Sequence, residues 1–293
     1  MSVNTDIITR LHLMVQDGTK SDRRLASLVL AEPDFASKAA ISEIAARIGV
    51  SEPTVTRFCR NLGCDGLRDF KFYLAQALAI GGPYFSPPPI NRDVREQRIA
   101  SAVVEAAITA IQRVNASLDM AALFAVADRL AVSGQVLCIG SGGISSMMAT
   151  ELQNRLFRLG ISAVAQVDGQ LQRMYAAVAK PETTVIAFSV SGYARSTVEA
   201  VQVARQYGAA TVAITPPDSA LGKAAATIIP FQSIEDGNIY KPTSSRYPLL
   251  AIIDMIATAT AEARGSDVLE NLRRIKQSVN TLKVDDPRLP LGD

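Results

Sequence analysis

The sequence is poor in the side chain most often used for acid–base catalysis. Its 293 residues include no tryptophan and a single histidine, His12, which lies in a predicted helical segment near the N-terminus. Histidine is the usual general acid or base of enzymes, because its ordinary pKa lies near neutral pH. Histidine catalysis is therefore nearly excluded for the rest of the chain, and we assign no catalytic residue.

Cysteine is also scarce. The three cysteines, Cys59, Cys64 and Cys138, are odd in number and scattered along the chain. A disulfide framework needs an even set, and a zinc site needs closely spaced ligands. We expect no disulfide, no metal and no cofactor, and we expect each thiol to be a small buried side chain.

Long apolar runs are absent as well. No stretch approaches the roughly 18 to 20 apolar residues that span a bilayer. The N-terminal sequence MSVNTDIITR lacks the apolar core of a signal peptide. The sequence predicts a cytoplasmic protein with no membrane partner.

The chain has no strong excess of either charge. It is 48% hydrophobic and 20% charged, with a formal net charge of +2, and residues 1–80 contain ten Lys and Arg against nine Asp and Glu. The length predicts two domains. With no strongly basic domain, any affinity for DNA must come from the local placement of a few cations.

One segment, ISEIAARIGVSEPTVTRFCRNL from Ile41 to Leu62, predicts two short helices around a turn. Apolar residues recur at helical spacing in its first part, and Gly49 stops that helix. Ser51 is a favourable N-cap, and the proline two residues later suits a first helical turn. The second helix is therefore expected to begin at about Glu52, and the segment reads as a helix-turn-helix.

The second helix of this segment is amphipathic. A recognition helix in a DNA major groove needs an apolar back held by its domain and hydrogen-bond donors in front. A solvated helix face is the alternative interpretation, and the tight preceding turn favours DNA binding. A dimer would present two such helices one DNA turn apart. The predicted DNA-contacting residues are Ser51, Thr54, Thr56, Arg57, Arg60 and Asn61.

The chain divides into regions of different composition. Residues 1–80 are expected to be all helical and to form the DNA-binding domain. Residues 81–95, GGPYFSPPPINRDVR, hold four of the fourteen prolines and predict a semi-stiff linker, with the double glycine ending the preceding helix. We expect a second domain over 96–284 and a tail over 285–293.

The second domain is predicted to be α/β. Helices are expected at 96–116 and 119–132 before the strands, and at 244–264 and 266–280 after them. Strands that alternate with helices predict a five-stranded parallel sheet flanked by helices. The expected strands are residues 135–140, 161–166, 183–189, 210–215 and 226–231.

Two loops at expected strand ends are rich in serine. They are IGSGGISS at 139–146 and SVSGYARST at 189–197, and each leads into a helix. Ligands of open parallel sheets bind beyond the carboxyl ends of the strands, and helix N-termini favour anions. The two loops therefore predict a phosphate site built from neutral donors. Its expected serines are Ser141, Ser145, Ser189, Ser191 and Ser196.

Two other interpretations of these loops remain open. Gly140, Gly142 and Asp168 partly mimic a dinucleotide-binding fingerprint, but Ser145 stands where its third glycine belongs. The loops are alternatively the tight turns that any strand–helix unit needs. That interpretation explains the glycines and leaves the serines on the same edge without a role.

A helical DNA-reading domain, a proline-rich linker and a sheet with paired serine loops together resemble the RpiR family of bacterial regulators. The C-terminal part of that family is a sugar isomerase (SIS) domain. The resemblance covers nearly the whole chain. It is carried by VSEPTVTRFCRNLG at 50–63, DFKFYLAQALAIGGPY at 69–84, LQRM at 171–174, EDGNIYKP at 235–242 and NLRRIK at 271–276.

The resemblance implies a function for both domains. It implies a repressor of glucose and Entner–Doudoroff genes, active as a homodimer or higher homo-oligomer on double-stranded operator DNA. Binding of a phosphorylated sugar acid, such as 2-keto-3-deoxy-6-phosphogluconate, would release the operator. In such a mechanism the effector shifts the geometry of the dimer and thus the spacing of its two recognition helices.

The resemblance also assigns ligand residues. Ser145 matches the serine of the family's G-x-G-x-S loop, although Ser141 replaces its first glycine, and Ser189 and Ser191 match the S-x-[ST]-G loop.

Two departures follow the S-x-[ST]-G motif within the second loop. Tyr193 and Ala194 stand where similar proteins commonly have Arg and Thr, which removes one charge and one donor. Arg246, before a long predicted helix, matches a common family position and is the candidate for the missing cation.

An enzyme is the main alternative function. A sugar-phosphate isomerase on the same sheet needs a base poised near neutral pH, and Glu151 is the only carboxylate near the loops. A dehydrogenase needs a nicotinamide and a hydride-transfer partner, for which no residues are identified. An isomerase also leaves the N-terminal domain without a role, so we expect a regulator without catalytic activity.

Overall fold

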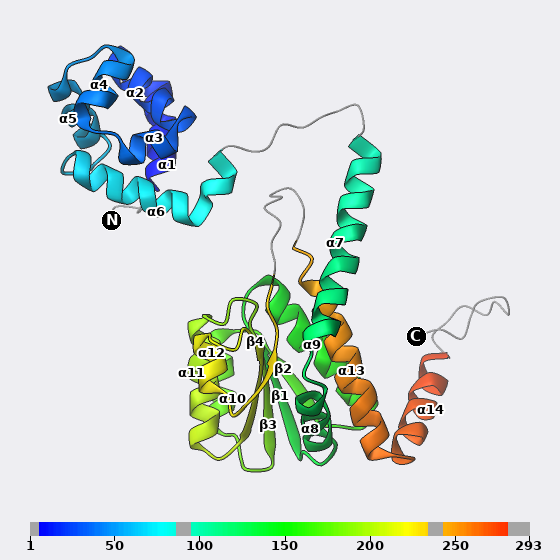
Figure 1. Ribbon diagram of the computed structural model, residues 1–293. Helices are drawn as coiled ribbons and strands as arrows, with labels where there is room; N and C mark the ends of the chain where they lie inside the picture. Colours follow the sequence, from blue (N-terminus) through cyan, green and yellow to red (C-terminus); the bar gives the residue numbers. More distant parts are fainter. Residues whose placement is uncertain (1–5, 86–94, 234–242, 281–293) are drawn as a thin grey trace. The chain divides into compact units, whose positions relative to one another are not determined.

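The computed structural model describes residues 6–85, 95–233 and 243–280. The chain folds as two compact units that divide after residue 93. One unit consists of helices and the other is built on a sheet (Figure 1). Within the described ranges, no helix has both the length and the apolar character needed to cross a membrane.

The N-terminal unit is all helical, as predicted. Its apolar core includes Leu11, Leu25 and Val29, and the rings of Phe58 and Phe70 pack edge to face with centroids 6.0 Å apart. Aromatic pairs favour this geometry. The helices are α1 (Ile7–Asp17), α2 (Lys20–Ala31), α3 (Pro33–Lys38), α4 (Ile41–Ile48), α5 (Glu52–Asn61) and α6 (Leu67–Phe85).

The predicted helix-turn-helix is formed by α4 and α5. Gly49 ends α4 in the left-handed conformation with φ of 67°, which glycine adopts without steric cost. Ser51 occupies the N-cap position of α5, as expected, but its hydroxyl lies 2.9 Å from the Thr54 hydroxyl and does not cap a backbone N–H. The positions of both helices are therefore confirmed, and the expected capping bond is absent.

The prediction that the double glycine ends a helix is wrong. Helix α6 continues through Gly81 and Gly82 to Phe85. A helical glycine costs only about 1 kcal/mol relative to alanine, which disfavours a helix without forbidding it. The first part of the expected linker is therefore helical, and its last residue, Arg95, begins α7 (Arg95–Ser117). Residues 86–94 of the linker and the tail over 285–293 lie outside the described residues.

The C-terminal unit contains the predicted five-stranded sheet, and all its strand pairs are parallel. The strand order is β2-β1-β3-β4-β5. The chain leaves β1 to one side for β2 and returns to the other side for β3, so the order reverses between β1 and β3. The strands are β1 (Gln135–Gly140), β2 (Ala163–Gln166), β3 (Thr183–Phe188), β4 (Ala210–Thr215) and β5 (Thr227–Pro230).

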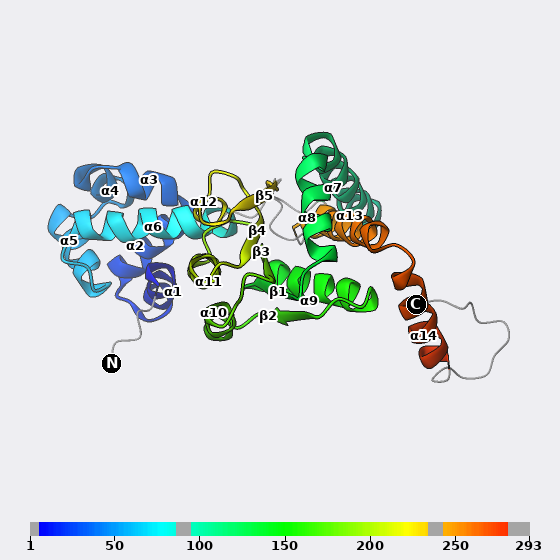
Figure 2. The same cartoon turned by 90° about the horizontal axis from the view of Figure 1, so that it is seen from below.

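Helices cover both faces of this sheet. Figure 2 shows α10, α11 and α12 on one face and α8, α9 and α13 on the other. The bounds of the helices are α7 (Arg95–Ser117), α8 (Met120–Ala131), α9 (Gly143–Arg158), α10 (Gly169–Ala177), α11 (Arg195–Gln206), α12 (Ala220–Ala224), α13 (Arg246–Arg264) and α14 (Asp267–Asn280). The predicted α/β class and its flanking helices are confirmed.

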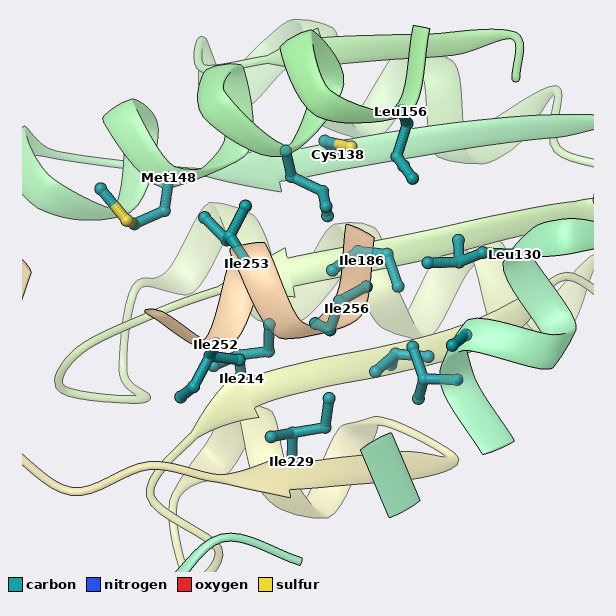
Figure 3. Close-up of a cluster of buried hydrophobic side chains, with 14 of the residues drawn as sticks. Leu130, Cys138, Met148, Leu156, Ile186, Ile214, Ile229, Ile252, Ile253 and Ile256 are labelled. Atoms are coloured by element: carbon teal, nitrogen blue, oxygen red, sulfur yellow. The ribbon is translucent and has the colours of Figure 1, made fainter. Parts of the chain in front are cut away.

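The larger core lies between the sheet and helices α8, α9 and α13. Cys138 and Ile186 from the central strands meet Ile253 and Ile256 of α13 there (Figure 3). Burying one such side chain contributes about 1.5–3 kcal/mol. This packing fixes the carboxyl ends of the strands, from which the serine loops begin.

All three cysteines are free and buried, which confirms their expected role as small core side chains. Burial raises the pKa of the Cys59 thiol from 9.0 to about 12. Burial also raises the pKa of the Cys138 thiol. Raised pKa values leave these thiols protonated and unreactive at neutral pH.

Candidate DNA-binding and sugar-phosphate sites

Helix α5 has an apolar back and a polar front, as predicted. Val55, Phe58 and Cys59 are almost completely buried in the core of the N-terminal unit. On the opposite side, Arg57 and Arg60 are exposed. A shallow hollow on this side is lined by Ile41, Glu52, Pro53, Thr56, Arg57 and Arg60.

The remaining predicted DNA-contacting residues lie on α5 or at its N-cap, and they differ in exposure and in hydrogen bonding. Ser51 and Asn61 are exposed, and Thr54 and Thr56 are half-buried. The Thr56 hydroxyl donates to the backbone carbonyl of Glu52 at 3.3 Å.

The two arginines of this face are unpaired among the residues that the structure describes. Neither the Arg57 nor the Arg60 guanidinium forms a hydrogen bond or ion pair there. Both therefore remain available to an external acceptor such as a phosphate or a guanine edge.

Two residues distant in sequence hold the C-terminal end of α5. Arg10 Nη1 donates to the Leu62 carbonyl at 2.9 Å. Asn61 Nδ2 donates to Oδ2 of Asp22 at 3.4 Å, and Asp22 is almost completely buried. Sequence reasoning missed both supports, because a spacing of about 40 to 50 residues leaves no local periodic signal.

The two serine loops meet at the carboxyl ends of the adjacent strands β1 and β3. The Ser141 hydroxyl lies 3.0 Å from the Ser196 hydroxyl. The backbone N–H of Val190 donates to Ser145 Oγ at 3.4 Å. The structure therefore brings both loops together at the point where the strand order reverses, which is where open parallel sheets bind ligands.

The five serines of these loops differ in exposure. Ser145 and Ser189 are buried, with 7% and 3% of their surfaces exposed. Ser189 Oγ accepts the N–H of Gly192 at 2.9 Å, so this hydroxyl stabilises its own loop.

The other three serines reach the surface. Ser191 is exposed, while Ser141 and Ser196 are half-buried. The sequence predicted five similar donors, and the structure separates two buried serines from three accessible ones.

The helices that follow the two loops begin without a capping side chain. The N-cap of α9 is Gly142, with φ of 80°, and the N-cap of α11 is Ala194. By contrast, Asp119, Asp168 and Ser219 accept first-turn N–H groups at the starts of α8, α10 and α12. The first-turn N–H groups of α9 and α11 can therefore serve an external anion.

Close packing requires glycine at the end of β1. A Cβ built on Gly140 would overlap the backbone carbonyl of Ser145 in the first turn of α9. The start of α9 thus lies directly against the end of the strand.

The structure does not join Arg246 to the serine loops. Arg246 begins α13, its guanidinium lies 4.9 Å from the Tyr247 ring centroid, and its Nη2 donates to the Tyr247 hydroxyl at 3.2 Å. No contact of Arg246 with the loop serines occurs within the described parts of the chain. Tyr193, in the second serine loop, is 69% exposed.

Two carboxylates invoked by the alternative functions are engaged elsewhere. Asp168, the acid of the partial dinucleotide fingerprint, accepts the N–H groups of Gln170 and Leu171 as the N-cap of α10. Glu151, the candidate isomerase base, forms an ion pair with Arg155 at 2.8 Å.

One buried residue beside the loops was missed by sequence reasoning. The amide of Gln172, on α10, donates to Ser141 Oγ at 3.0 Å. Gln172 belongs to the segment LQRM, in which no pattern indicates that the amide points inward.

Comparison with known proteins identifies both units. Residues 5–81 match the helix-turn-helix domain of the rpiR family, and residues 129–259 match the SIS domain. The chain is 32% identical over 292 residues to the HTH-type transcriptional regulator HexR of Escherichia coli K12, covering 98% of this chain and 99% of the relative. It is 30% identical over 274 residues to HexR of Pseudomonas aeruginosa, covering 94% and 95%.

A solved structure shares the fold. The Vibrio vulnificus NanR protein, complexed with ManNAc-6P, superimposes with a TM-score of 0.60 at 22% identity and covers 95% of this chain and all of that chain. The nearly full-length similarity to HexR agrees with the helix-turn-helix and the parallel sheet described above. The chain therefore belongs to the RpiR family of helix-turn-helix transcriptional regulators that carry a C-terminal SIS domain.

Proposed function

We propose that this regulator is a repressor of carbohydrate catabolism genes that leaves its operator when a sugar phosphate occupies the serine loops. The observation that carries the proposal is the pair of uncapped helices, α9 and α11, which begin beside half-buried and exposed serines at the switch point of the sheet. Such an arrangement suits an anionic phosphate group. In the other unit, the exposed arginines of α5 supply contacts to operator DNA.

The proposed effector is a phosphorylated sugar acid, with 2-keto-3-deoxy-6-phosphogluconate as the first candidate, and the proposed target is a set of glucose and Entner–Doudoroff genes. The supporting observation is the 30–32% identity to HexR over nearly the whole chain. NanR, which shares the fold, is complexed with another sugar phosphate, ManNAc-6P. The proposed working form is a homodimer in the cytoplasm, bound to a two-fold symmetric operator.

The proposed function includes no catalysis. An isomerase needs a free base over the sugar carbons, and the Glu151 carboxylate is already paired with Arg155. Binding alone suffices for regulation, because an effector that prefers the DNA-free form a hundredfold supplies about 2.7 kcal/mol of coupling.

A titration of operator binding tests this function. An operator is first selected from a random duplex pool, and its affinity is measured by fluorescence anisotropy with increasing 2-keto-3-deoxy-6-phosphogluconate, N-acetylmannosamine 6-phosphate, fructose 6-phosphate or inorganic phosphate. We expect the sugar acid to release the operator at the lowest concentration. The proposal is wrong if none of the sugar phosphates weakens operator binding, or if one of them is isomerised.

A further inference from the structure

The buried residue Gln172 has a defined amide orientation. Its Nε2 lies 3.1 Å from the backbone carbonyl of Gln166, at the end of β2. A carbonyl only accepts hydrogen bonds, so the nitrogen must be on this side of the amide. Its Oε1 then faces Thr197, whose hydroxyl donates to it at 3.1 Å. Both Gln172 and Thr197 have no exposed surface.

This orientation determines where the hydroxyl protons of the site point. Both Nε2 protons are used, one on the Gln166 carbonyl and the other on Ser141 Oγ at 3.0 Å. Because Ser141 Oγ accepts this proton, its own proton is left to donate. The nearby acceptors are Ser196 Oγ at 3.0 Å and Thr197 Oγ1 at 3.3 Å.

The hydroxyl proton of Ser196 can be assigned in the same way. Thr197 has one hydroxyl proton, which Gln172 Oε1 accepts. When Ser141 donates to Ser196, the Ser196 proton is free, and Ser196 is half-buried at the surface. The chain of donors thus runs from the buried amide through Ser141 and Ser196 toward solvent.

We propose that Gln172 is a positioning residue of the effector site, which orients the Ser141 hydroxyl as a donor to Ser196 and so leaves the Ser196 proton to donate to a bound phosphate. This inference rests on the proposed function, because it assumes that the phosphate occupies the serine loops. It also gives α10 a role: its amide connects the end of β2, the loop after β1 and the first turn of α11. A phosphate needs donors, and the buried amide donor behind Ser141 keeps that hydroxyl's proton directed toward Ser196.

The variant Gln172→Glu reverses this polarity with almost no change in shape. A carboxylate only accepts, so Ser141 would donate inward, and a negative charge would lie close to the anion site. We expect the dissociation constant of 2-keto-3-deoxy-6-phosphogluconate and that of inorganic phosphate, measured by calorimetry on the full chain, to rise by about tenfold or more.

The pH dependence of ligand binding by Gln172→Glu distinguishes a reversed hydrogen-bond direction from a general disruption of the site. Burial raises the pKa of a carboxyl, and the protonated acid regains one donor. The ratio of the variant's dissociation constant to that of the parent is therefore expected to fall toward one between about pH 8 and about pH 6. Taking the ratio cancels the titration of the phosphate itself.

Two further variants complete the design. Gln172→Met removes the amide without adding a charge, and we expect weaker binding with a ratio that does not change with pH. Arg173→Gln breaks the exposed ion pair of α10 with Glu199 on α11, and we expect unchanged binding. If Gln172→Glu does not fold, the ligand affinity of Gln172→Met tests the role of the amide.

Three results would overturn the inference. Parent-like affinity in the folded Gln172 variants, or a Gln172→Glu ratio that is constant with pH, would refute the role of Gln172 and leave the proposed function intact. Failure of the parent chain to bind either probe would refute the proposed function and, with it, this inference.

Discussion

At the residue scale, the proposed DNA-reading face presents two arginine side chains. Arg57 and Arg60 are exposed on α5, while Val55 and Phe58 on the other side of the helix are buried in the core. The first 80 residues carry almost balanced charge. Under the proposed function, affinity for the operator therefore comes from where these guanidinium groups lie, and not from a general positive field.

Replacing Arg57 or Arg60 by alanine is expected to weaken operator binding by between about fivefold and a hundredfold, the range for one arginine contact to a base or phosphate. Both side chains lack partners among the described residues, so circular dichroism and the melting temperature should stay unchanged. Anisotropy titrations over a series of salt concentrations measure the loss of affinity, and losing a phosphate contact also lowers the salt dependence of binding.

The matched control for these variants is Arg273→Ala. It removes one exposed positive charge from α14, in the other unit, where Arg273 pairs with Glu270. We expect its operator affinity to equal that of the parent. Equal affinity in the Arg57, Arg60 and Arg273 variants would show that α5 does not read the DNA.

At the element scale, the proposed function depends on how helices begin and end. Gly49 ends α4 and sets the turn into α5, whereas Gly142 and Ala194 begin α9 and α11 without a capping side chain. A cap normally stabilises a helix by about 1 kcal/mol. The absence of caps at these two positions is consistent with N–H groups kept available for a phosphate.

The variant Ala194→Asp places a capping carboxylate at the start of α11. Ala194 already has extended backbone angles, φ −64° and ψ 104°, as an N-cap requires. We expect a gain of about 1 kcal/mol in stability, or about 2–4 °C in melting temperature, together with the loss of sugar-phosphate binding. Scanning calorimetry and ligand titration measure the two effects.

The control Ala194→Ser adds a neutral cap at the same position. Because a hydroxyl both accepts and donates, it is expected to stabilise α11 while preserving the affinity for sugar phosphate. Sugar-phosphate affinity that is unaffected by Ala194→Asp would place the anion site away from α11.

The elements also indicate what a sequence can predict. All five strands and helices α4 and α5 were located from apolar periodicity and turn residues, because these signals are local. The end of α6 was misplaced, since glycine is only a weak helix breaker. The positions of Ser145 and Ser189 in the loops were predicted, but their burial depends on packing between segments about 45 residues apart in the sequence.

Gln172 illustrates the same limit at the site. Its partners, Ser141 and Thr197, lie 31 and 25 residues away in the sequence. Residues that meet only through tertiary structure leave no periodic signal, so a buried glutamine in a short helix looks like an exposed one. Arg246 shows the converse: a sequence match predicted a ligand residue that the structure pairs with Tyr247.

At the scale of the whole molecule, each of the two units has its own apolar core. The proposed DNA-reading helix lies in one unit and the serine loops lie in the other. Regulation therefore requires a coupling free energy between the two sites, and such coupling is reciprocal. If the effector weakens operator binding by some factor, the operator must weaken effector binding by the same factor.

The most direct test of this account measures that reciprocity on the full chain. The dissociation constant of 2-keto-3-deoxy-6-phosphogluconate is determined by calorimetry with and without saturating operator duplex, and that of the operator by anisotropy with and without saturating effector. We predict that both constants rise by one common factor of about 5 to 150. A sugar phosphate that binds the chain but leaves the operator affinity unchanged would contradict the account.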